Sequence, residues 1–285
     1  MAALLLGVAT LSSAAGPPRP KGHLLMIGGG PRPPEIMGKF RELAGDARAR
    51  VLVFPQASSR AEAGPELQAE LRDLGLGEVV LMSVDRAQAD GEEAVRRMDG
   101  ASGVYFGGGD QSQLTGLIKG TRIEARLHEL YRAGAVIAGT SAGAAVMSRL
   151  MITGDERRPY SKEDAFQTIE SGDVVTGEGF GFLEDVVVDQ HFVRRRRHNR
   201  LLSVVLENPR LAGVAIDEST AVWVRPDRTF EVIGDGPVLV YDAGSAQVEH
   251  DAGYGLRGAG LRLHVLRRGS LFDLDTREVK RLGPS

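Results

Sequence analysis

The first half of the chain alternates short apolar runs with amphipathic segments. The apolar runs are each followed by glycine, proline or serine, and they cover residues 23–27, 50–54, 79–82, 103–106 and 135–138. Segments with helical spacing lie between them, near residues 34–45, 61–74, 91–99 and 121–133. Continuous apolar runs that alternate with helices predict an α/β fold with a mostly parallel sheet and helices on both faces. Such sheets carry their sites at the carboxyl ends of the strands.

The pattern changes after about residue 210. Apolar segments then follow one another closely, with turn residues between them, at residues 213–217, 221–224, 230–233, 238–241 and 261–266. This spacing predicts C-terminal β-hairpin additions that extend or flank the same sheet. The Gly- and Ala-rich stretch 242–260 is expected to be a loop.

Composition narrows the possible chemistry. The chain has 285 residues, 42% of them hydrophobic and 26% charged, which is ordinary for a soluble enzyme domain. The net charge of −3 gives no basic field of the kind that attracts nucleic acid. Cysteine is absent, so disulfides, a thiol nucleophile and thiolate metal ligands are excluded.

The N-terminus is apolar and uncharged from residue 2 to residue 15, and residues 16–20 are typical of a linker. The small residues 13–15 suit a signal-peptidase site, and the run is too short to span a bilayer. We therefore expect a signal peptide and linker at 1–21, a single domain at 22–285, no stable membrane insertion, and a secreted or periplasmic protein. No basic residue separates Met1 from the apolar run, so a cytoplasmic location stays open as the alternative.

Ser141 lies in the sequence Gly139-Thr140-Ser141-Ala142-Gly143, directly after an apolar run and before a helix-like segment. Strand, tight turn and helix form the context of a nucleophile elbow, in which the serine hydroxyl is exposed at the top of a sheet. The alternative is a Gly/Ser-rich turn that only packs closely. The context favours Ser141 as a nucleophile.

A serine nucleophile needs a base, and six histidines are available. His23 and His264 lie in apolar strand patterns and are expected to be structural. His128 lies on an amphipathic helix and is expected to face solvent, whereas His250 falls in the expected loop. His191 ends an apolar run where a strand passes into a loop, so it is the candidate base.

The base needs a carboxylate to orient it. Asp217 and Glu218 end a predicted strand, and the spacing alone does not choose between them. The resulting chain order is serine, histidine, acid. That order differs from the serine, acid, histidine order of α/β-hydrolases and matches the order found in class I glutamine amidotransferase-like folds.

An acyl transfer also needs donors for the oxyanion. The backbone N–H of Ala142 is one candidate, and the glycine loop at 107–109 can supply a second through Gly109, since glycine permits unusual N–H orientations. The competing interpretation of the two glycine runs, residues 28–30 and 107–109, is a phosphate loop. Neither run continues into G-K-[ST] or forms G-x-G-x-x-G, so a nucleotide site is not expected.

A basic run, Arg194-Arg195-Arg196-Arg197-His198-Asn199-Arg200, follows the candidate base. Such runs are usually solvated or bind polyanions, but arginines next to a nucleophile also suit substrate carboxylates. A metal site built from Asp189, His191 and His198 fits no standard ligand spacing, and no metal is expected.

Together these motifs resemble the cyanophycinases, in the dipeptidase E-like family of serine peptidases. The resemblance covers roughly residues 22–283. It is carried by residues 106–111, 138–144, 189–192, the arginines up to residue 201, and residues 213–218, and the segment from residue 263 to residue 274 is similar as well.

The resemblance implies a Ser–His–Glu triad at Ser141, His191 and Glu218, and so it selects Glu218 over Asp217. The family's substrate-binding positions fall on six residues. They are Gln111, Asp189, Gln190, Arg195, Arg197 and Arg200. The family usually has smaller residues between its arginines and a glycine before the last one, where this chain has Arg194, Arg196, His198 and Asn199.

The implied activity is hydrolysis of cyanophycin, multi-L-arginyl-poly-L-aspartate, to β-Asp-Arg dipeptides through an acyl-enzyme. The resemblance further implies a homodimer and no metal or organic cofactor. One alternative is a related peptidase that acts on Asp-initiated or isoaspartyl peptides. Another is an inactive amidotransferase-like binding module, which the presence of Ser141, His191 and Glu218 disfavours.

Overall fold

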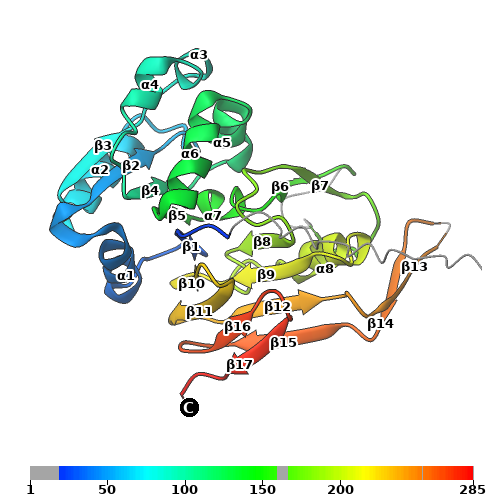
Figure 1. Cartoon of the computed structure of the whole chain (residues 1–285). Coiled ribbons are helices and arrows are strands. Elements are labelled where there is room, and N and C mark those ends of the chain that lie inside the picture. The colour runs from blue at the N-terminus through cyan, green and yellow to red at the C-terminus, as the bar shows by residue number, and fades with distance from the viewer. Residues whose placement is uncertain (1–18, 159–165, 252, 285) are drawn as a thin grey trace, which may run out of the picture.

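A nine-stranded sheet organises the molecule (Figure 1). The structure is a computed structural model, and it describes residues 19–158, 166–251 and 253–284. The sheet order is β17-β16-β11-β10-β1-β5-β4-β2-β3. The parallel strands are β1 (His23–Ile27), β5 (Val136–Thr140), β4 (Gly103–Phe106), β2 (Arg50–Phe54) and β3 (Glu78–Leu81). The predicted α/β class is confirmed, and the sheet as a whole is mixed because antiparallel strands extend it beyond β1.

Helices cover both faces of the parallel strands because those strands are apolar on both faces. Leu24 and Met26 of β1 join one core cluster, whereas Leu25 and Ile27 join the other, as the alternation of side chains along a strand requires. The helices α1 (Pro34–Ala44) and α2 (Ala63–Asp73) pack on the second cluster. On the first cluster lie α3 (Arg86–Ala89), α4 (Glu92–Arg96), α5 (Gln111–Ile118), α6 (Arg122–Ala133) and α7 (Ala142–Ala145), and a 3-10 turn, η1 (Asp46–Arg48), precedes β2.

The C-terminal strands both extend the main sheet and form a second sheet beside it, the two arrangements that the sequence left open. An antiparallel group extends the main sheet beyond β1, and it consists of β10 (Thr220–Val224), β11 (Thr229–Gly234), β16 (Leu271–Asp273) and β17 (Glu278–Arg281). A separate four-stranded sheet flanks it, in the order β15 (Arg262–Leu266), β12 (Val238–Asp242), β9 (Ala212–Ile216) and β8 (Val186–Gln190).

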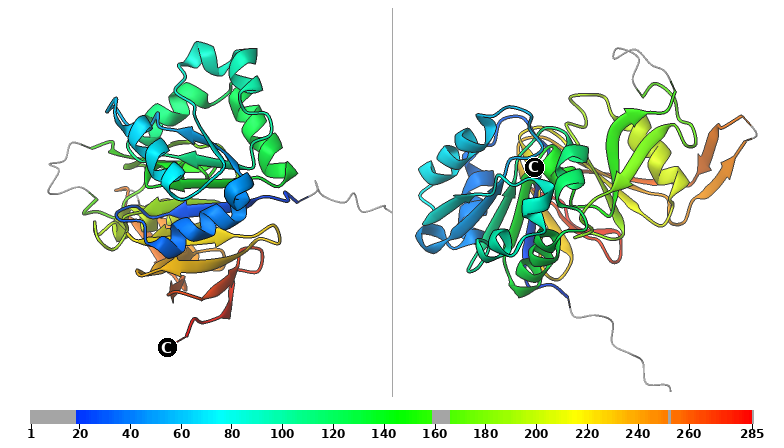
Figure 2. Two further views of the ribbon diagram at one scale, coloured as in Figure 1. Left: turned by 90° about the vertical axis from the view of Figure 1, so that its left-hand side faces the viewer. Right: turned by 90° about the horizontal axis from the view of Figure 1, so that it is seen from above.

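The expected loop at 242–260 contains a hairpin, so that prediction is wrong. Its strands are β13 (Gln247–His250) and β14 (Leu256–Ala259). The hairpin projects from the body of the molecule in Figure 1 and in the right-hand view of Figure 2. His250 therefore lies on a strand. The hairpin carries mostly exposed residues, so the apolar alternation that marks a strand is missing.

Several further elements were not predicted, α5, β16 and β17 among them. Others are the strand pair β6 (Leu150–Glu156) and β7 (Val174–Glu178) and the helix α8 (His198–Glu207), which begins inside the basic run. The helix buries Leu201 and Val204 against the second sheet, so the end of the basic run starts a packed helix. No helix in the described ranges is long and apolar enough to cross a membrane. The expected signal peptide lies outside the described residues.

Backbone hydrogen bonds join the loops that follow β1, β5 and β8. Ser141 N–H donates to the Ile27 carbonyl at 2.9 Å, and His191 N–H donates to the Gly28 carbonyl at 2.8 Å. The first glycine loop, residues 28–30 after β1, is thus held between the end of β5 in one sheet and the end of β8 in the other. This junction gathers the candidate site.

Candidate active site

Ser141 occupies a strained turn between β5 and α7. Its backbone has φ 54° and ψ −114°, a combination that favours glycine. The glycines of the motif are needed for close approach: a Cβ on Gly139 would lie 2.2 Å from the Gly143 carbonyl oxygen, and one on Gly143 would lie 2.4 Å from the Phe106 carbonyl oxygen. This geometry is that of a nucleophile elbow.

Ser141, His191 and Glu218 form a continuous chain of hydrogen bonds. The His191 Nε2 atom lies 2.9 Å from Ser141 Oγ, and its Nδ1 atom lies 2.6 Å from Glu218 Oε1. His191 itself has a positive φ of 49°, which turns its side chain back toward the serine. Asp217, the other candidate acid, instead accepts a hydrogen bond from the Arg194 N–H at 3.0 Å. The structure therefore brings Glu218 to the histidine.

Burial and charge set the protonation of this chain. Burial lowers the pKa of His191 below its ordinary value of 6.5, although the hydrogen bond that His191 donates to Glu218 opposes this effect. The hydrogen bond to His191 in turn lowers the pKa of Glu218. At neutral pH the site therefore holds a neutral imidazole and an ionised carboxylate, the states that a general base and its orienting acid need.

The first glycine loop is a part of the site to which sequence reasoning gave no role. A Cβ on Gly29 would lie 2.3 Å from the His191 ring, and one on Gly30 would lie 2.9 Å from Glu218 Cβ. Both glycines also have positive φ values, 103° and 68°. The signal in the sequence was three glycines at the end of the first strand, and the structure shows that they make room for the histidine and the acid.

The second glycine loop lies against the serine, as expected for an oxyanion site. A Cβ on Gly108 would lie 3.4 Å from Ser141 Cβ. Gly109 has φ 144°, and a Cβ there would lie 2.0 Å from the Ala57 carbonyl oxygen, so only glycine fits. Ala142 begins α7 directly after the serine. The two candidate oxyanion donors thus lie in the glycine loop that packs on Ser141 and at the start of the helix that follows it.

A hollow of about 250 Å³ opens beside Ser141. Five of the six candidate substrate-binding residues line it, namely Gln111, Gln190, Arg195, Arg197 and Arg200. Residues 153–155 of β6 line another side of it, and Gln111 Nε2 donates to the carbonyl oxygens of Ile152 and Thr153 at 2.8 Å and 2.6 Å. The unpredicted β6 strand therefore contributes a wall of the site.

The sixth candidate, Asp189, is buried beneath this hollow. It forms a two-bond ion pair with Arg200, and each residue is only 1% exposed. Arg197 Nη1 donates to the Gln190 backbone carbonyl and to its side-chain Oε1, at 2.7 Å and 2.6 Å, and lies 3.9 Å from Asp189 Oδ1. The Asp189–Arg200 pair thus supports the arginine that faces the hollow.

The residues that depart from the family pattern point elsewhere. His198 Nδ1 lies 2.7 Å from the Tyr241 hydroxyl, and Asn199 donates to the Gln167 carbonyl at 3.1 Å. Asp189, His191 and His198 have separate partners, and the described residues contain no group of acidic and histidine side chains arranged to hold a metal ion.

Of the remaining histidines, His23 and His264 match expectation and His128 does not. His23 pairs with the indole N–H of Trp223 at 3.1 Å, and His264 packs on Phe272. His128 was expected to face solvent, and that is wrong: its Nε2 lies 2.8 Å from the Phe180 carbonyl, and its ring packs on Phe182. The segment around residue 180, which has no regular structure, covers this part of α6.

Comparison with known proteins identifies the family of this chain. The model of peptidase family S51 matches residues 24–232. Cyanophycinase from Synechococcus elongatus is 35% identical over 270 residues, which cover 91% of this chain and 81% of that relative. Cyanophycinase from Nostoc sp. is 32% identical over 252 residues, which cover 86% of this chain and 82% of that relative.

A solved structure shares the fold. The crystal structure of a peptidase from an acI-B1 Actinobacterium superposes with a TM-score of 0.65 at 23% identity, covering 88% of this chain and 96% of that one. The family match spans both the sheet that carries Ser141 and the strand that precedes Glu218. The chain therefore belongs to peptidase family S51 and is a serine-type peptidase.

Proposed function

We propose that this peptidase hydrolyses cyanophycin, multi-L-arginyl-poly-L-aspartate, to β-Asp-Arg dipeptides. The observation that carries the proposal is the hydrogen-bonded chain of Ser141, His191 and Glu218 opening onto a hollow lined by three arginines. Each unit of the polymer carries a free carboxylate on its arginyl branch, which arginine side chains bind well. Relatives named cyanophycinase add support.

In the proposed mechanism, His191 Nε2 takes the proton of the Ser141 hydroxyl as the serine oxygen attacks the scissile carbonyl. The carbon–nitrogen bond then breaks, and the histidine passes its proton to the leaving amine. Water repeats the sequence on the ester: His191 removes its proton, the hydroxide displaces Ser141, and the serine regains a proton. Glu218 stays ionised and stabilises the imidazolium.

Backbone groups beside the serine and side chains of the hollow have different roles in this proposal. Backbone N–H groups of Gly109 and Ala142 stabilise the oxyanion, since donors fixed before the reaction cost no reorganisation. Arg195 and Arg197 bind substrate carboxylate, and Gln111 and Gln190 shape the hollow. Burial and the charge of Arg200 lower the pKa of Arg197, so an incoming carboxylate would relieve an unfavourable environment.

Product analysis tests the proposal. Purified protein is incubated separately with cyanophycin and with isoaspartyl dipeptides, and products are identified by mass. Release of β-Asp-Arg from the polymer is expected. Cleavage of isoaspartyl or Asp-initiated peptides without attack on cyanophycin would favour the related peptidase activity, and no cleavage of either class would favour an inactive binding module.

We also propose that the mature domain is exported and forms a homodimer. The uncharged run at 2–15 supports export. Leu263 and Val265, which are 53% and 58% exposed on the edge strand β15, support an interface between copies. N-terminal sequencing of the processed protein and light scattering test these two points, for which an unprocessed N-terminus and a monomer are the contrary results.

A further inference from the structure

A second hollow opens beside the nucleophile, on the glycine loop that follows β4. Gly107 and Gly108 line it, and its volume is about 210 Å³. The arginine-rich hollow is lined instead by Gly109 and Ser141, and the two hollows share no lining residue. Gly108 and Gly109 are consecutive residues, so the two hollows meet the same short loop at neighbouring positions.

The second hollow continues into a groove along the carboxyl edge of the sheet. It shares Pro55, Ser58 and Arg60 with a third hollow of about 400 Å³, which in turn shares Ser83 and Val84 with a fourth of about 200 Å³. The lining residues follow β4, then β2, then β3, which is the order of these strands in the sheet. We call this series of three hollows the edge groove.

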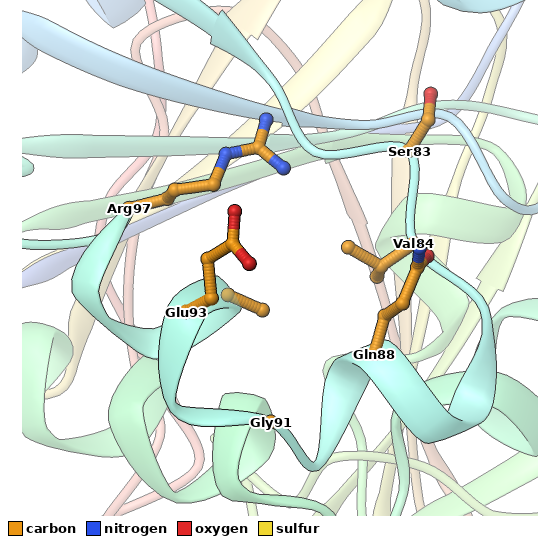
Figure 3. A pocket seen from close by; sticks show the side chains of 7 residues that line it. Ser83, Val84, Gln88, Gly91, Glu93 and Arg97 are labelled. Carbon is orange, nitrogen blue, oxygen red and sulfur yellow. The ribbon is translucent and has the colours of Figure 1, made fainter.

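The edge groove presents both signs of charge at successive positions. In the hollow at Gly107 and Gly108, Arg32 forms two hydrogen bonds with Glu70, and the Arg60 guanidinium lies 2.8 Å from the Glu66 carboxylate. In the far hollow, the side chains of Glu93 and Arg97 lie side by side (Figure 3). The hollow beside Ser141 is more basic, since its three arginines outnumber its two carboxylates, Asp110 and Asp155. The groove therefore suits a ligand that carries both charges.

We propose that the edge groove binds the units of cyanophycin that lie beyond the scissile bond, and that Arg60 and Glu66 contact the arginyl branch of the first such unit. This inference rests on the proposed function. Each branch carries one carboxylate and one guanidinium, which match an arginine and a glutamate respectively.

The dimensions agree with a polymer. Neighbouring strands lie about 4.8 Å apart, so the three steps from β5 to β3 span about 14 Å. An extended backbone advances about 3.5 Å per residue, so the groove can follow about four units. The enzyme thereby gains affinity for long substrates without adding contacts at the reacting carbonyl.

The test uses the full-length protein with Arg60→Gln and Glu66→Gln. Both side chains are more than half exposed, so their loss should not unfold the protein. The matched control is Arg149→Gln, which breaks a similarly exposed pair between Arg149, just before β6, and Glu184 at 2.7 Å. Steady-state rates are measured on a two-unit oligomer and on the polymer, and labelling of Ser141 by a fluorophosphonate reports the nucleophile independently of substrate.

Each groove variant should raise KM about tenfold on both substrates, equivalent to about 1.4 kcal/mol, with kcat within about twofold. The control should match the wild type. Wild-type KM in both groove variants would overturn the edge groove and leave the proposed function standing. If the wild-type enzyme is labelled but releases no β-Asp-Arg, the proposed substrate fails and the groove assignment fails with it.

Discussion

The Nε2 atom of His191 lies 2.9 Å from the Oγ atom of Ser141, yet the two residues follow strands of different sheets. Ser141 ends β5 in the nine-stranded sheet, whereas His191 follows β8 in the four-stranded sheet. The first glycine loop joins them through hydrogen bonds from both backbone N–H groups. Small shifts between the two sheets would therefore change the contact on which the proposed chemistry depends.

Two substitutions of Ser141 should distinguish the role of its hydroxyl in catalysis from the strain in its backbone. Ser141→Ala is expected to reduce kcat by about 10⁶-fold, the size of the loss seen when a serine nucleophile is removed, with little change in melting temperature. Ser141→Gly should be equally inactive but more stable than the alanine variant by about 1 kcal/mol, because glycine tolerates φ 54°. Residual turnover near the wild-type level in either variant would contradict the nucleophile assignment, and chemical denaturation measures the stability difference.

The acid limb of the pH profile should report His191. Because burial lowers its pKa below 6.5, the imidazole stays neutral, and kcat/KM stays high, as pH falls to 6.5. Activity should then decline with an apparent pKa below that value. An inflection above 6.5 would assign the limb to another group.

Glu218→Gln should move this limb further toward acid, since the carboxylate raises the pKa of His191. It should also lower kcat by about 10⁴-fold through loss of the correct tautomer. Rate profiles of the two proteins from pH 4 to pH 8 measure both effects. An unchanged inflection in the variant would show that Glu218 does not act on the base.

Gly29→Ala should impair catalysis by displacing the His191 ring, which lies 2.3 Å from the position of the added carbon. We expect a large fall in kcat and a smaller loss of stability. Gly38→Ala is the matched control, because a Cβ there meets nothing within 4 Å inside α1 and should stabilise the helix by about 0.5–1 kcal/mol. Equal activity of the two variants would remove the proposed role of the first glycine loop.

Substitutions at Asp189 and Arg197 should distinguish a structural role from a role in substrate binding. Asp189→Asn leaves the buried Arg200 charge without its partner, so it should lower the free energy of unfolding by about 3 kcal/mol. Arg197→Ala should mainly raise KM for β-Asp-Arg substrates. Thermal melts and steady-state kinetics on both variants decide the matter, and a large loss of stability in Arg197→Ala would indicate a structural role instead.

Much of the site's scaffold was predictable because it depends on local sequence. Apolar runs followed by glycine place Ser141 and both glycine loops at strand ends, and one edge of a parallel sheet brings such ends together. The unpredicted parts have weak local signals. The β13–β14 hairpin is exposed on both faces, and the start of α8 is hidden in a basic run whose charge suggested a solvated surface.

The sequence by itself determined the α/β sheet, the elbow at Ser141 and a short set of candidate bases and acids, since strand periodicity and glycine chemistry act over a few residues. Only the tertiary structure decided which side chains meet. It directs Glu218 to His191 and Asp217 to the Arg194 N–H, and it buries Asp189 against Arg200 beneath the hollow. Those choices depend on side-chain direction and on contacts between two sheets, neither of which neighbouring residues encode.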